Sequence, residues 1–207
     1  MNEHILTVLK KLEERSQLEE SNQIEVNHED RILAITEDTG QFYNLFLKAI
    51  KAKKILEVGT SVGYSTLWFA DALIENGGSV TTIEQNSSKI NRSKANFKEA
   101  KVDHIIKSME GEAMSILKQI SENINKDKKL QFDFAFLDAD KELNREYFDL
   151  ILPMIKVGGI IATDNILYPE KFRPIMEKFV NHVKQIPNVQ TFTLDLGNGE
   201  HLSIKTS

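Results

Sequence analysis

Two short polar segments of this chain carry residue types that suit cation binding and proton transfer. The segment from Asp138 to Lys141 directly follows one apolar run, and Asp164-Asn165 directly follows another. If both runs are buried parallel strands, these polar residues meet at the carboxyl edge of one sheet, where open α/β sheets bind ligands. Carboxylate and amide oxygens suit a hard divalent cation, and an amine beside them can accept a proton. The pattern therefore predicts a cation site with a base next to it.

The composition is that of an ordinary globular protein. The 207 residues suit a single domain with a sizeable core, and 41% are apolar and 28% charged. The net charge of −5 argues against a broad nucleic-acid surface but leaves a local basic groove open. The chain has no cysteine, which excludes disulfides, thiolate metal sites and cysteine nucleophiles.

Nothing in the sequence indicates contact with a membrane. No apolar run approaches the roughly 20 residues of a membrane span. The first four residues, from Met1 to His4, lack the basic and apolar regions of a signal peptide. We therefore expect a cytoplasmic protein with no membrane partner.

From residue 53 onward the pattern alternates between strands and helices. We expect strands at 54–58, 79–83, 104–106, 132–137 and 159–163, and helices at 63–75, 88–100, 111–123, 142–156 and 170–186. Such alternation predicts a parallel sheet that is covered on both faces. Two further strands, 188–195 and 201–205, are joined by so short a turn that they must form an antiparallel hairpin. The expected fold is a doubly wound, seven-stranded α/β sheet, mostly parallel, with a C-terminal antiparallel hairpin.

The first 35 residues are expected to form an N-terminal helical cap on the core, 36–207, of a single domain. Apolar residues recur at helical spacing over 4–20, so this helix lies either on its own domain or on a second subunit, which favours a homodimer. Thr36 is expected to cap a second helix. The apolar face expected for that second helix consists of Phe42, Leu45, Phe46, Ala49 and Ile50.

A turn with two glycines follows the first expected strand. Glycines let the backbone approach a ligand closely, and the following helix offers free N–H groups. Gly59 and Gly63 are four residues apart, which does not match the G-x-G-x-x-G pattern and disfavours a NAD-dependent oxidoreductase. Glu57 in the turn would repel a phosphate but suits an ammonium or sulfonium ligand. Glu84 ends the next strand, where an acidic residue can bind ribose hydroxyls.

Taken together, these motifs resemble the class I methyltransferases that use S-adenosylmethionine. More narrowly, they are similar to the cation-dependent O-methyltransferases of the catechol and caffeoyl-CoA type, in order and spacing over about 30–207. The matching positions are Glu57, Gly59, Gly63, Tyr64, Ser65, Gly111, Ala113, Asp138, Ala139, Asp140, Lys141, Gly158, Gly159, Asp164 and Asn165. The resemblance implies a Rossmann-like fold with 36–207 as the cofactor-binding and catalytic core.

The same resemblance implies a set of residues around S-adenosylmethionine. These are Glu57, Gly59, Thr60, Ser65, Glu84, Glu112, Ala113 and Asp138. Glu57 would support the turn, Glu84 would bind the ribose, and Asp138 would lie between the cofactor's amino group and the metal. Glu112 stands where many relatives have aspartate, beside the expected adenine position.

The resemblance further implies that Asp138, Asp164 and Asn165 bind a metal and that Lys141 is the catalytic base. Oxygen ligands without a nearby histidine favour Mg²⁺, with Ca²⁺ and Mn²⁺ also fitting, over zinc. Three protein ligands leave room for two substrate oxygens, so we expect a small aromatic vicinal diol such as a catechol. A neighbouring dication favours the neutral amine of Lys141, which can then accept a proton.

Two departures from the family concern the acceptor. Asn144 occupies a position where many relatives have tyrosine, although Tyr147 follows three residues later. After Asn165 the plant-type enzymes have a tryptophan and a long insertion, whereas this chain passes through Tyr168 and Pro169 almost directly into the next helix. These differences argue against caffeoyl-CoA itself and favour a more open acceptor site.

Two other functions remain open at the level of sequence. Some bacterial members of the family methylate a hydroxylated uridine in transfer RNA, and this function predicts a basic groove from Lys141, Arg145, Lys171 and Arg173. Alternatively, the chain could be a non-catalytic cofactor-binding subunit of another protein. The complete set of acidic residues beside Lys141 disfavours the second alternative, because a binding module does not need it.

Overall fold

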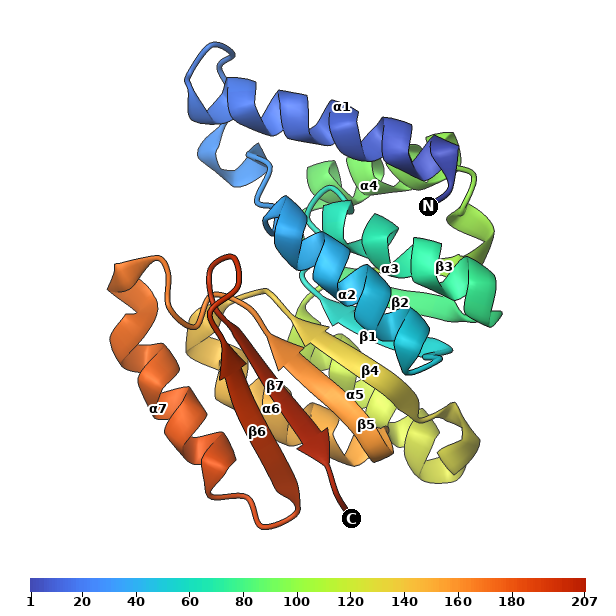
Figure 1. Cartoon of the computed structure of the whole chain (residues 1–207), viewed down its shortest axis with the longest axis vertical. Coiled ribbons are helices and arrows are strands. Elements are labelled where there is room, and N and C mark those ends of the chain that lie inside the picture. Colours follow the sequence, from blue (N-terminus) through green and yellow to red (C-terminus); the bar gives the residue numbers. More distant parts are fainter.

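A seven-stranded sheet in the order β3-β2-β1-β4-β5-β7-β6 forms the centre of the computed structural model, which describes residues 1–207 (Figure 1). The strands are β1 (Lys54–Val58), β2 (Ser79–Glu84), β3 (Ile106–Glu110), β4 (Phe132–Leu137), β5 (Ile155–Thr163), β6 (Val189–Leu194) and β7 (Glu200–Lys205). The first five run parallel to one another, and β7 pairs antiparallel with both β5 and β6. The expected doubly wound sheet with a C-terminal antiparallel hairpin is confirmed.

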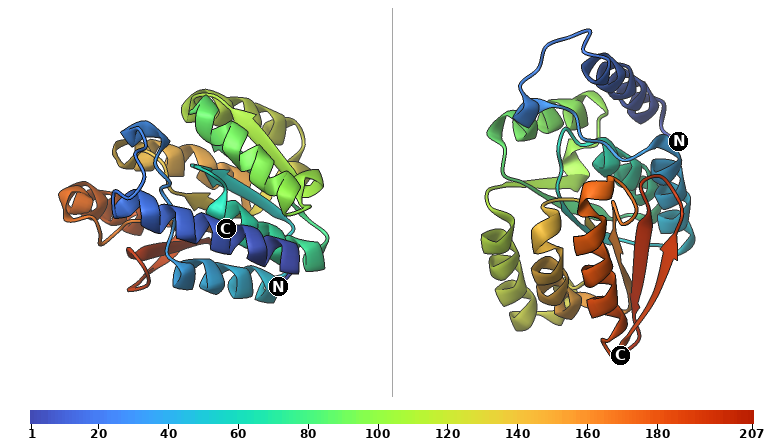
Figure 2. Two further views of the ribbon diagram at one scale, coloured as in Figure 1. Left: turned by 90° about the horizontal axis from the view of Figure 1, so that it is seen from above. Right: turned by 90° about the vertical axis from the view of Figure 1, so that its left-hand side faces the viewer.

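Seven α-helices cover this sheet from both sides (Figure 2). They are α1 (Glu3–Glu20), α2 (Glu37–Ala49), α3 (Tyr64–Asn76), α4 (Ser87–Glu99), α5 (Ala113–Lys126), α6 (Asn144–Ile151) and α7 (Arg173–Lys184). One core lies between the sheet and α1 to α4, and a second lies between the sheet and α5 to α7. This two-sided burial explains why the central strands are almost continuously apolar.

Three expected elements have clearly different boundaries in the structure. The third strand is not 104–106 but β3, because Asp103–Ile105 forms a 3₁₀ turn and the strand begins at Ile106. β3 is the edge of the sheet and has only two apolar residues, Ile106 and Met109, which are not adjacent, so it lacks an apolar run. The helix expected at 142–156 ends at Ile151, because Pro153 has no N–H to continue it, and β5 begins at Ile155 rather than at 159.

The N-terminal helix packs on its own chain. Ile5, Val8, Leu9 and Leu12 are each at most 6% exposed and belong to the core shared with α3 and α4. The apolar stripe of α1 is therefore not available to a second subunit, and this ground for expecting a homodimer is wrong. None of the helices in the chain has the length and apolar character required to cross a bilayer.

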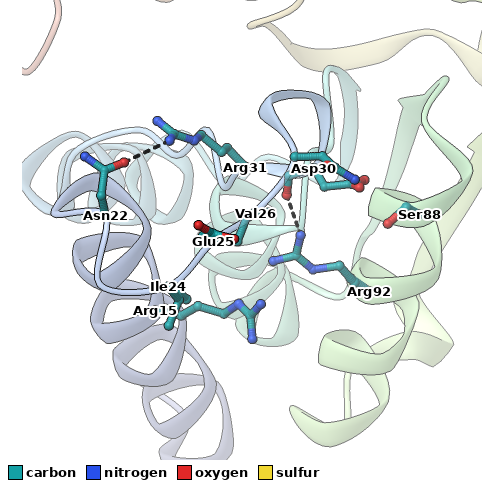
Figure 3. Close-up of a pocket in the computed structure, with 10 residues that line it drawn as sticks. Arg15, Asn22, Ile24, Glu25, Val26, Asp30, Arg31, Ser88 and Arg92 are labelled. Atoms are coloured by element: carbon teal, nitrogen blue, oxygen red, sulfur yellow. Dashed lines mark hydrogen bonds between the residues drawn. The ribbon is translucent and has the colours of Figure 1, made fainter.

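A buried carboxylate ties the segment after α1 to its surroundings. Glu19 is 2% exposed and accepts a hydrogen bond from the backbone N–H of Ile32 at 2.7 Å. It also forms an ion pair with Arg15 at 3.0 Å. Arg92 of α4 lies 3.6 Å from the same carboxylate and donates to the carbonyl of Asp30 at 2.6 Å. Arg15, Asp30 and Arg92 also line an open, mainly polar hollow of about 780 Å³ (Figure 3).

The second helix presents a different face to the core from the one expected. Its buried residues are Thr39, Gly40, Tyr43, Asn44 and Leu47. In contrast, Leu45 is 69% exposed and Ile50 is 40% exposed. The helix follows the predicted spacing, but part of the predicted apolar face points away from the domain.

His201 on β7 gives a pH-dependent contribution to stability. Its side chain is fully buried, with Nδ1 2.8 Å from the hydroxyl of Thr193. Burial, assisted by the charge of Lys184, lowers the pKa of His201 from 6.5 to about 4. The folded protein therefore binds fewer protons here than the unfolded chain, so the contribution is complete above pH 6.5 and is lost as the pH falls towards 4.

We expect this loss to amount to about 2 kcal/mol between about pH 7 and about pH 5. The variant His201→Asn keeps a polar group near Thr193 but does not titrate, so its unfolding free energy should fall less over the same interval. Urea unfolding of both proteins at both pH values measures the difference. The same pH dependence in the two proteins would contradict the assignment.

Candidate active site

The polar segments that follow β1, β4 and β5 lie together because these strands are neighbours in a parallel sheet. The backbone N–H of Asp138 donates to the carbonyl of Val58 at 2.9 Å, and that of Asp164 donates to the carbonyl of Leu137 at 3.1 Å. The strand pairing thus continues one residue beyond the regular sheet. As a result Asp138 and Asp164 leave the sheet at one edge, as the sequence predicts.

The glycine turn after β1 touches the first of these acidic segments. Gly59 has a φ of +102°, and a Cβ on it would lie 2.0 Å from the carbonyl oxygen of Asp138. Gly63 has a φ of +90°, and a Cβ there would lie 2.3 Å from the ring of Phe97. Both positions therefore require glycine for conformation and for space. The turn and the backbone of Asp138 form one continuous wall.

Glu57 organises this turn from inside the protein. It is fully buried and accepts hydrogen bonds of 2.5 Å from the hydroxyls of Ser65, Thr66 and Thr82. Burial raises the pKa of Glu57 to about 7, although the three hydroxyl donors oppose that rise. The hydroxyl of Thr60 also bonds to Thr82, at 2.5 Å. Because these side chains are hydrogen-bonded to one another, the backbone of the turn is the part that can contact a ligand.

Glu84 stands at the end of β2, beside the turn. Its two carboxylate oxygens accept from the backbone N–H groups of Ser61 at 2.8 Å and Asn86 at 2.9 Å. The side chain is half-buried. Each carboxylate oxygen still has a free lone pair, so this fixed acid can accept further hydrogen bonds from hydroxyl groups.

Glu112 and Ala113 lie at the start of α5. Glu112 caps the helix, accepting from the backbone N–H groups of Met114 and Ser115 at 2.8 Å each. The hydroxyl and backbone N–H of Ser115 are the main causes that lower the pKa of this exposed carboxyl. Because the Glu112 side chain is engaged in the cap, the backbone around Ala113 is the part of this segment free to face a ligand.

The amine of Lys141 is held directly at the acidic cluster. Its Nζ lies 2.6 Å from Oδ1 of Asp138, and the lysine side chain is only 9% exposed. Asp140 instead accepts from the backbone N–H of Glu142 at 3.0 Å and caps the 3₁₀ turn Lys141–Leu143. The structure therefore separates the two aspartates, with Asp138 beside the amine of Lys141 and Asp140 in a helix-capping role.

Asp164 and Asn165 complete the oxygen-rich edge. Asp164 is 2% exposed, and its Oδ1 accepts from the backbone N–H of Asn165 at 2.5 Å. Burial and the negative charge of Asp138 raise the pKa of Asp164 to about 7. Two neighbouring carboxyl groups with one amine beside them fit a bound dication, which would offset the repulsion between their charges. The chain has no group of three or more histidine, aspartate or glutamate side chains that could by themselves hold a metal ion.

A third buried carboxyl group, which the sequence analysis missed, adjoins this edge. Glu200 is fully buried, lies beside Asp164 and accepts from the hydroxyl of Tyr43 at 2.5 Å. Burial, followed by the charge of Asp164, raises the pKa of Glu200 well above its usual value. A lone glutamate after a turn gives no motif. Only the antiparallel register, in which Thr163 pairs with His201, brings it beside Asp164.

The β6–β7 turn fixes the segment that follows Asn165. The carbonyl of Asn198 accepts from the backbone N–H groups of Leu167 and Tyr168 at 3.0 Å, and that of Gly199 accepts from Ile166 at 3.0 Å. At the end of this segment, the Tyr168 side chain is 60% exposed. The short connection after Asn165 is thus held by backbone hydrogen bonds rather than by an insertion.

Nothing in the structure supports the basic groove expected for a transfer-RNA substrate. Lys141 is paired with Asp138, Arg145 lies 3.8 Å from an acid of its own helix, and Arg173 lies 3.7 Å from Glu177. The ammonium group of Lys171 sits over the ring of Phe172. Three of the four basic side chains thus lie beside an acidic residue.

Comparison with known proteins places these features in a wider group. The model of the O-methyltransferase family matches residues 10–206. A caffeoyl-CoA O-methyltransferase of Populus kitakamiensis is 39% identical over 136 residues, which make up 66% of this chain and 56% of that relative. The match therefore spans little more than half of the relative's length.

Solved structures share the fold. An O-methyltransferase from Bacillus cereus, described in complex with SAH, has a TM-score of 0.78 and 24% identity, covering 97% of this chain and 91% of that one. The O-methyltransferase TomG of Streptomyces achromogenes, described in complex with SAM, has a TM-score of 0.79 and 24% identity, covering 97% and 90% of the two chains. At this level of identity the likeness shows the fold alone.

The contact between the glycine turn and Asp138 can be tested with two matched substitutions. Gly59→Ala and Gly77→Ala both place a Cβ at positive φ, but only Gly59 has a backbone atom in the way, since nothing lies within 4 Å of a Cβ on Gly77. We expect Gly77→Ala to cost about 1 kcal/mol of unfolding free energy and Gly59→Ala at least about 2 kcal/mol more. Urea unfolding measures both, and equal losses would show that the close approach to Asp138 is unimportant.

Proposed function

The chain belongs to the O-methyltransferase family, whose members take their methyl group from S-adenosylmethionine, and we propose that this enzyme methylates one hydroxyl of a small aromatic vicinal diol with the help of a divalent cation. The cation, Mg²⁺ in this proposal, would be held by Asp138, Asp164 and Asn165. Hard oxygen donors without a histidine support Mg²⁺ over zinc, and Ca²⁺ and Mn²⁺ are the alternatives to test.

The observation that carries this proposal is the position of Asp138 between the glycine turn and the amine of Lys141. Its backbone carbonyl lies against Gly59 of the glycine turn, and its carboxylate lies 2.6 Å from Lys141. S-adenosylmethionine supplies an electrophilic methyl group when bound along that turn. A cation bound at the acidic edge would favour loss of the acceptor's proton and orient the acceptor oxygen. One residue therefore links the proposed cofactor half and the proposed acceptor half.

The cofactor half is formed mainly by backbone. Glu57 holds the turn through Ser65, so Gly59 and Thr60 can present backbone atoms to the methionine end of the cofactor. Glu84 is fixed in place to accept hydrogen bonds from ribose hydroxyls, and the backbone around Ala113 would meet the adenine. These roles follow from the family resemblance. They are compatible with the hydrogen bonds that the side chains of Glu57, Glu84 and Glu112 already make.

Lys141 would act on the proton of the acceptor. Its amine is nearly buried and already lies within hydrogen-bond distance of Asp138 at the acidic edge. In the proposed step the acceptor hydroxyl loses its proton to the lysine amine while its oxygen forms the new bond to the methyl carbon. The bond between that carbon and the cofactor's sulfur breaks at the same time. The products are a methyl ether and S-adenosylhomocysteine.

The structure favours an acceptor smaller than the thioester named in the relatives. The Populus enzyme is described as acting on caffeoyl-CoA, but the match covers 56% of its length. In this chain the segment after Asn165 is short and is fastened to Asn198 and Gly199, with the ring of Tyr168 exposed at its end. We propose that this ring flanks an open site for a catechol-like diol.

The proposed reaction is tested by methyl transfer from labelled S-adenosylmethionine to a catechol and to its mono-methylated form, which has a single free hydroxyl. We expect turnover of the catechol, little turnover of the mono-methylated compound, and loss of activity with EDTA that added Mg²⁺ restores. Full activity in EDTA would remove the cation from the proposal. Equal turnover of the two acceptors would remove the requirement for a diol.

Lys141→Ala tests the proposed base. We expect turnover to fall by about 10²- to 10⁴-fold, because a positioned proton acceptor contributes that much, while affinity for S-adenosylhomocysteine stays unchanged. Lys156→Ala is a matched control, since Lys156 is also paired with an aspartate, Asp133 at 2.7 Å, away from the site. Comparable turnover in the two variants would exclude Lys141 as the base.

A further inference from the structure

Lysine side chains gather at the edge of the sheet opposite the candidate active site, where β1, β4 and β5 begin and β7 ends. Because Lys156 lies at the start of β5 and Asp164 follows its end, this edge is roughly 25 Å from the acidic cluster at about 3.3 Å per residue. We call this surface the amino-edge face. Its six lysines are Lys53, Lys54, Lys128, Lys129, Lys156 and Lys205.

Hydrogen bonds show that lysines from three segments form one surface. Oδ2 of Asp133 accepts from the backbone N–H groups of Lys53 and Lys54 at 2.8 Å each. Oδ1 of the same aspartate lies 2.7 Å from Nζ of Lys156. The amine of Lys54 in turn donates to the backbone carbonyl of Lys129 at 2.5 Å. The start of β1, the turn before β4 and the start of β5 therefore lie side by side.

Lys205 extends the same surface to the end of β7. Its Nζ donates to the backbone carbonyl of Ile155, at the start of β5, at 3.0 Å. Burial, and after it the charge of Lys128, lowers the pKa of Lys205. The amines of Lys128 and Lys205 are thus close enough for their charges to repel each other.

Neighbouring acids do not balance the charge of the amino-edge face. Of its six ammonium groups, only that of Lys156 forms an ion pair, with Asp133. The chain as a whole carries a net charge of −5, so this face differs in sign from the protein's total charge. A cation at the end of an α-helix would be stabilised by the helix dipole, but none of the six lysines lies in an α-helix. The concentration of positive charge therefore points to an anionic partner.

Two exposed apolar side chains lie among these lysines. Leu130 is 43% exposed and Val157 is 65% exposed, and each directly follows a lysine of the face. The side-chain amide of Gln131 donates to the backbone carbonyl of Ile155 at 3.3 Å, so the turn that carries Leu130 is fastened to the start of β5. The amino-edge face thus combines positive charge with exposed apolar groups.

This combination fits an anionic lipid surface better than a nucleic acid. Lysine is a compact charge that needs no fixed partner geometry, and lysines near an anionic membrane are attracted to its headgroups. Apolar side chains between lysines can enter the boundary between headgroups and acyl chains. Nucleic-acid sites usually add arginine, which binds phosphates and bases with two hydrogen bonds, and aromatic rings, which stack on bases. The amino-edge face contains neither of these residue types.

We propose that the amino-edge face is a peripheral docking surface for membranes that contain anionic phospholipid. The lysines contact the phosphate-bearing headgroups, and Leu130 and Val157 enter the boundary beneath them. The candidate active site lies at the opposite edge of the sheet and stays open to the aqueous phase. Such contact needs no spanning helix. It departs from the expected lack of a membrane partner, which rested on the absence of an apolar span and of a signal peptide, and it does not depend on the reaction catalysed.

Cosedimentation of the full chain with phospholipid vesicles tests the proposal. We expect binding to phosphatidylcholine vesicles that contain roughly one third phosphatidylserine, weakening as salt is added, and little binding to phosphatidylcholine alone. Lys128→Glu combined with Lys129→Glu should weaken binding by about 30-fold or more, since the loss of each lysine charge alone costs about fivefold.

Lys10→Glu combined with Lys94→Glu is the matched control, because it changes the net charge by the same amount. Both lysines are exposed, on α1 and α4, and α1 lies at the opposite end of the molecule from the C-terminus that follows β7 (Figure 1). This variant should bind the vesicles within about fivefold of the unmodified protein. Leu130→Asn should weaken binding by about fivefold without changing its salt dependence, because it removes apolar surface but no charge.

Four results would overturn the proposal. They are no binding to the anionic vesicles at low salt, an equal loss of binding in the two double variants, full binding by Leu130→Asn, and tighter binding to transfer RNA than to vesicles. The last result would assign the amino-edge face to a nucleic acid. Thermal unfolding confirms that each variant is folded. If the double glutamate variant is not, Lys128→Ala combined with Lys129→Ala gives the same comparison, with an expected loss of about 30-fold.

Discussion

Three carboxyl groups, from Asp138, Asp164 and Glu200, crowd one edge of the sheet, where a single amine, that of Lys141, balances them. Two of the three are almost completely buried, so water cannot stabilise their charges. Burial, and after it the repulsion between neighbouring carboxylates, raises the pKa values of Asp164 and Glu200. Such a cluster persists only where the surrounding structure holds the carboxyl groups in place. The dication that we propose would offset the repulsion between their charges.

The rest of the fold can be understood as the means of holding that cluster next to a ligand-binding turn. The parallel register of β1, β4 and β5 brings the acidic residues to one edge, and Gly59 lets the turn lie against Asp138. Glu57 fixes the turn from below through three hydroxyls. The β6–β7 turn holds the segment after Asn165, and Tyr43 holds Glu200.

The sequence predicts the parts of this arrangement that depend on local order along the chain. Asp138, Lys141 and Asp164 could be found because each follows or closely succeeds a buried strand, and neighbouring parallel strands end together. Glu200 could not be found in this way, because the antiparallel pairing of β7 with β5 brings it beside Asp164. Tyr43 could not be found either, because it reaches Glu200 from helix α2, 157 residues away in the sequence. The face of α2 was misjudged for a related reason, since helical spacing identifies an apolar stripe but not what covers it.

Binding of Mn²⁺, measured by the electron paramagnetic resonance of the free ion, tests the proposed metal site most directly. We expect one Mn²⁺ site per chain, displaced by Mg²⁺ and strongly weakened by Asp164→Ala and by Asn165→Ala. Asp149→Ala, at a half-exposed acid on α6, should leave the site intact. The absence of a stoichiometric site in the unmodified protein, or equal binding in all of these proteins, would contradict the account.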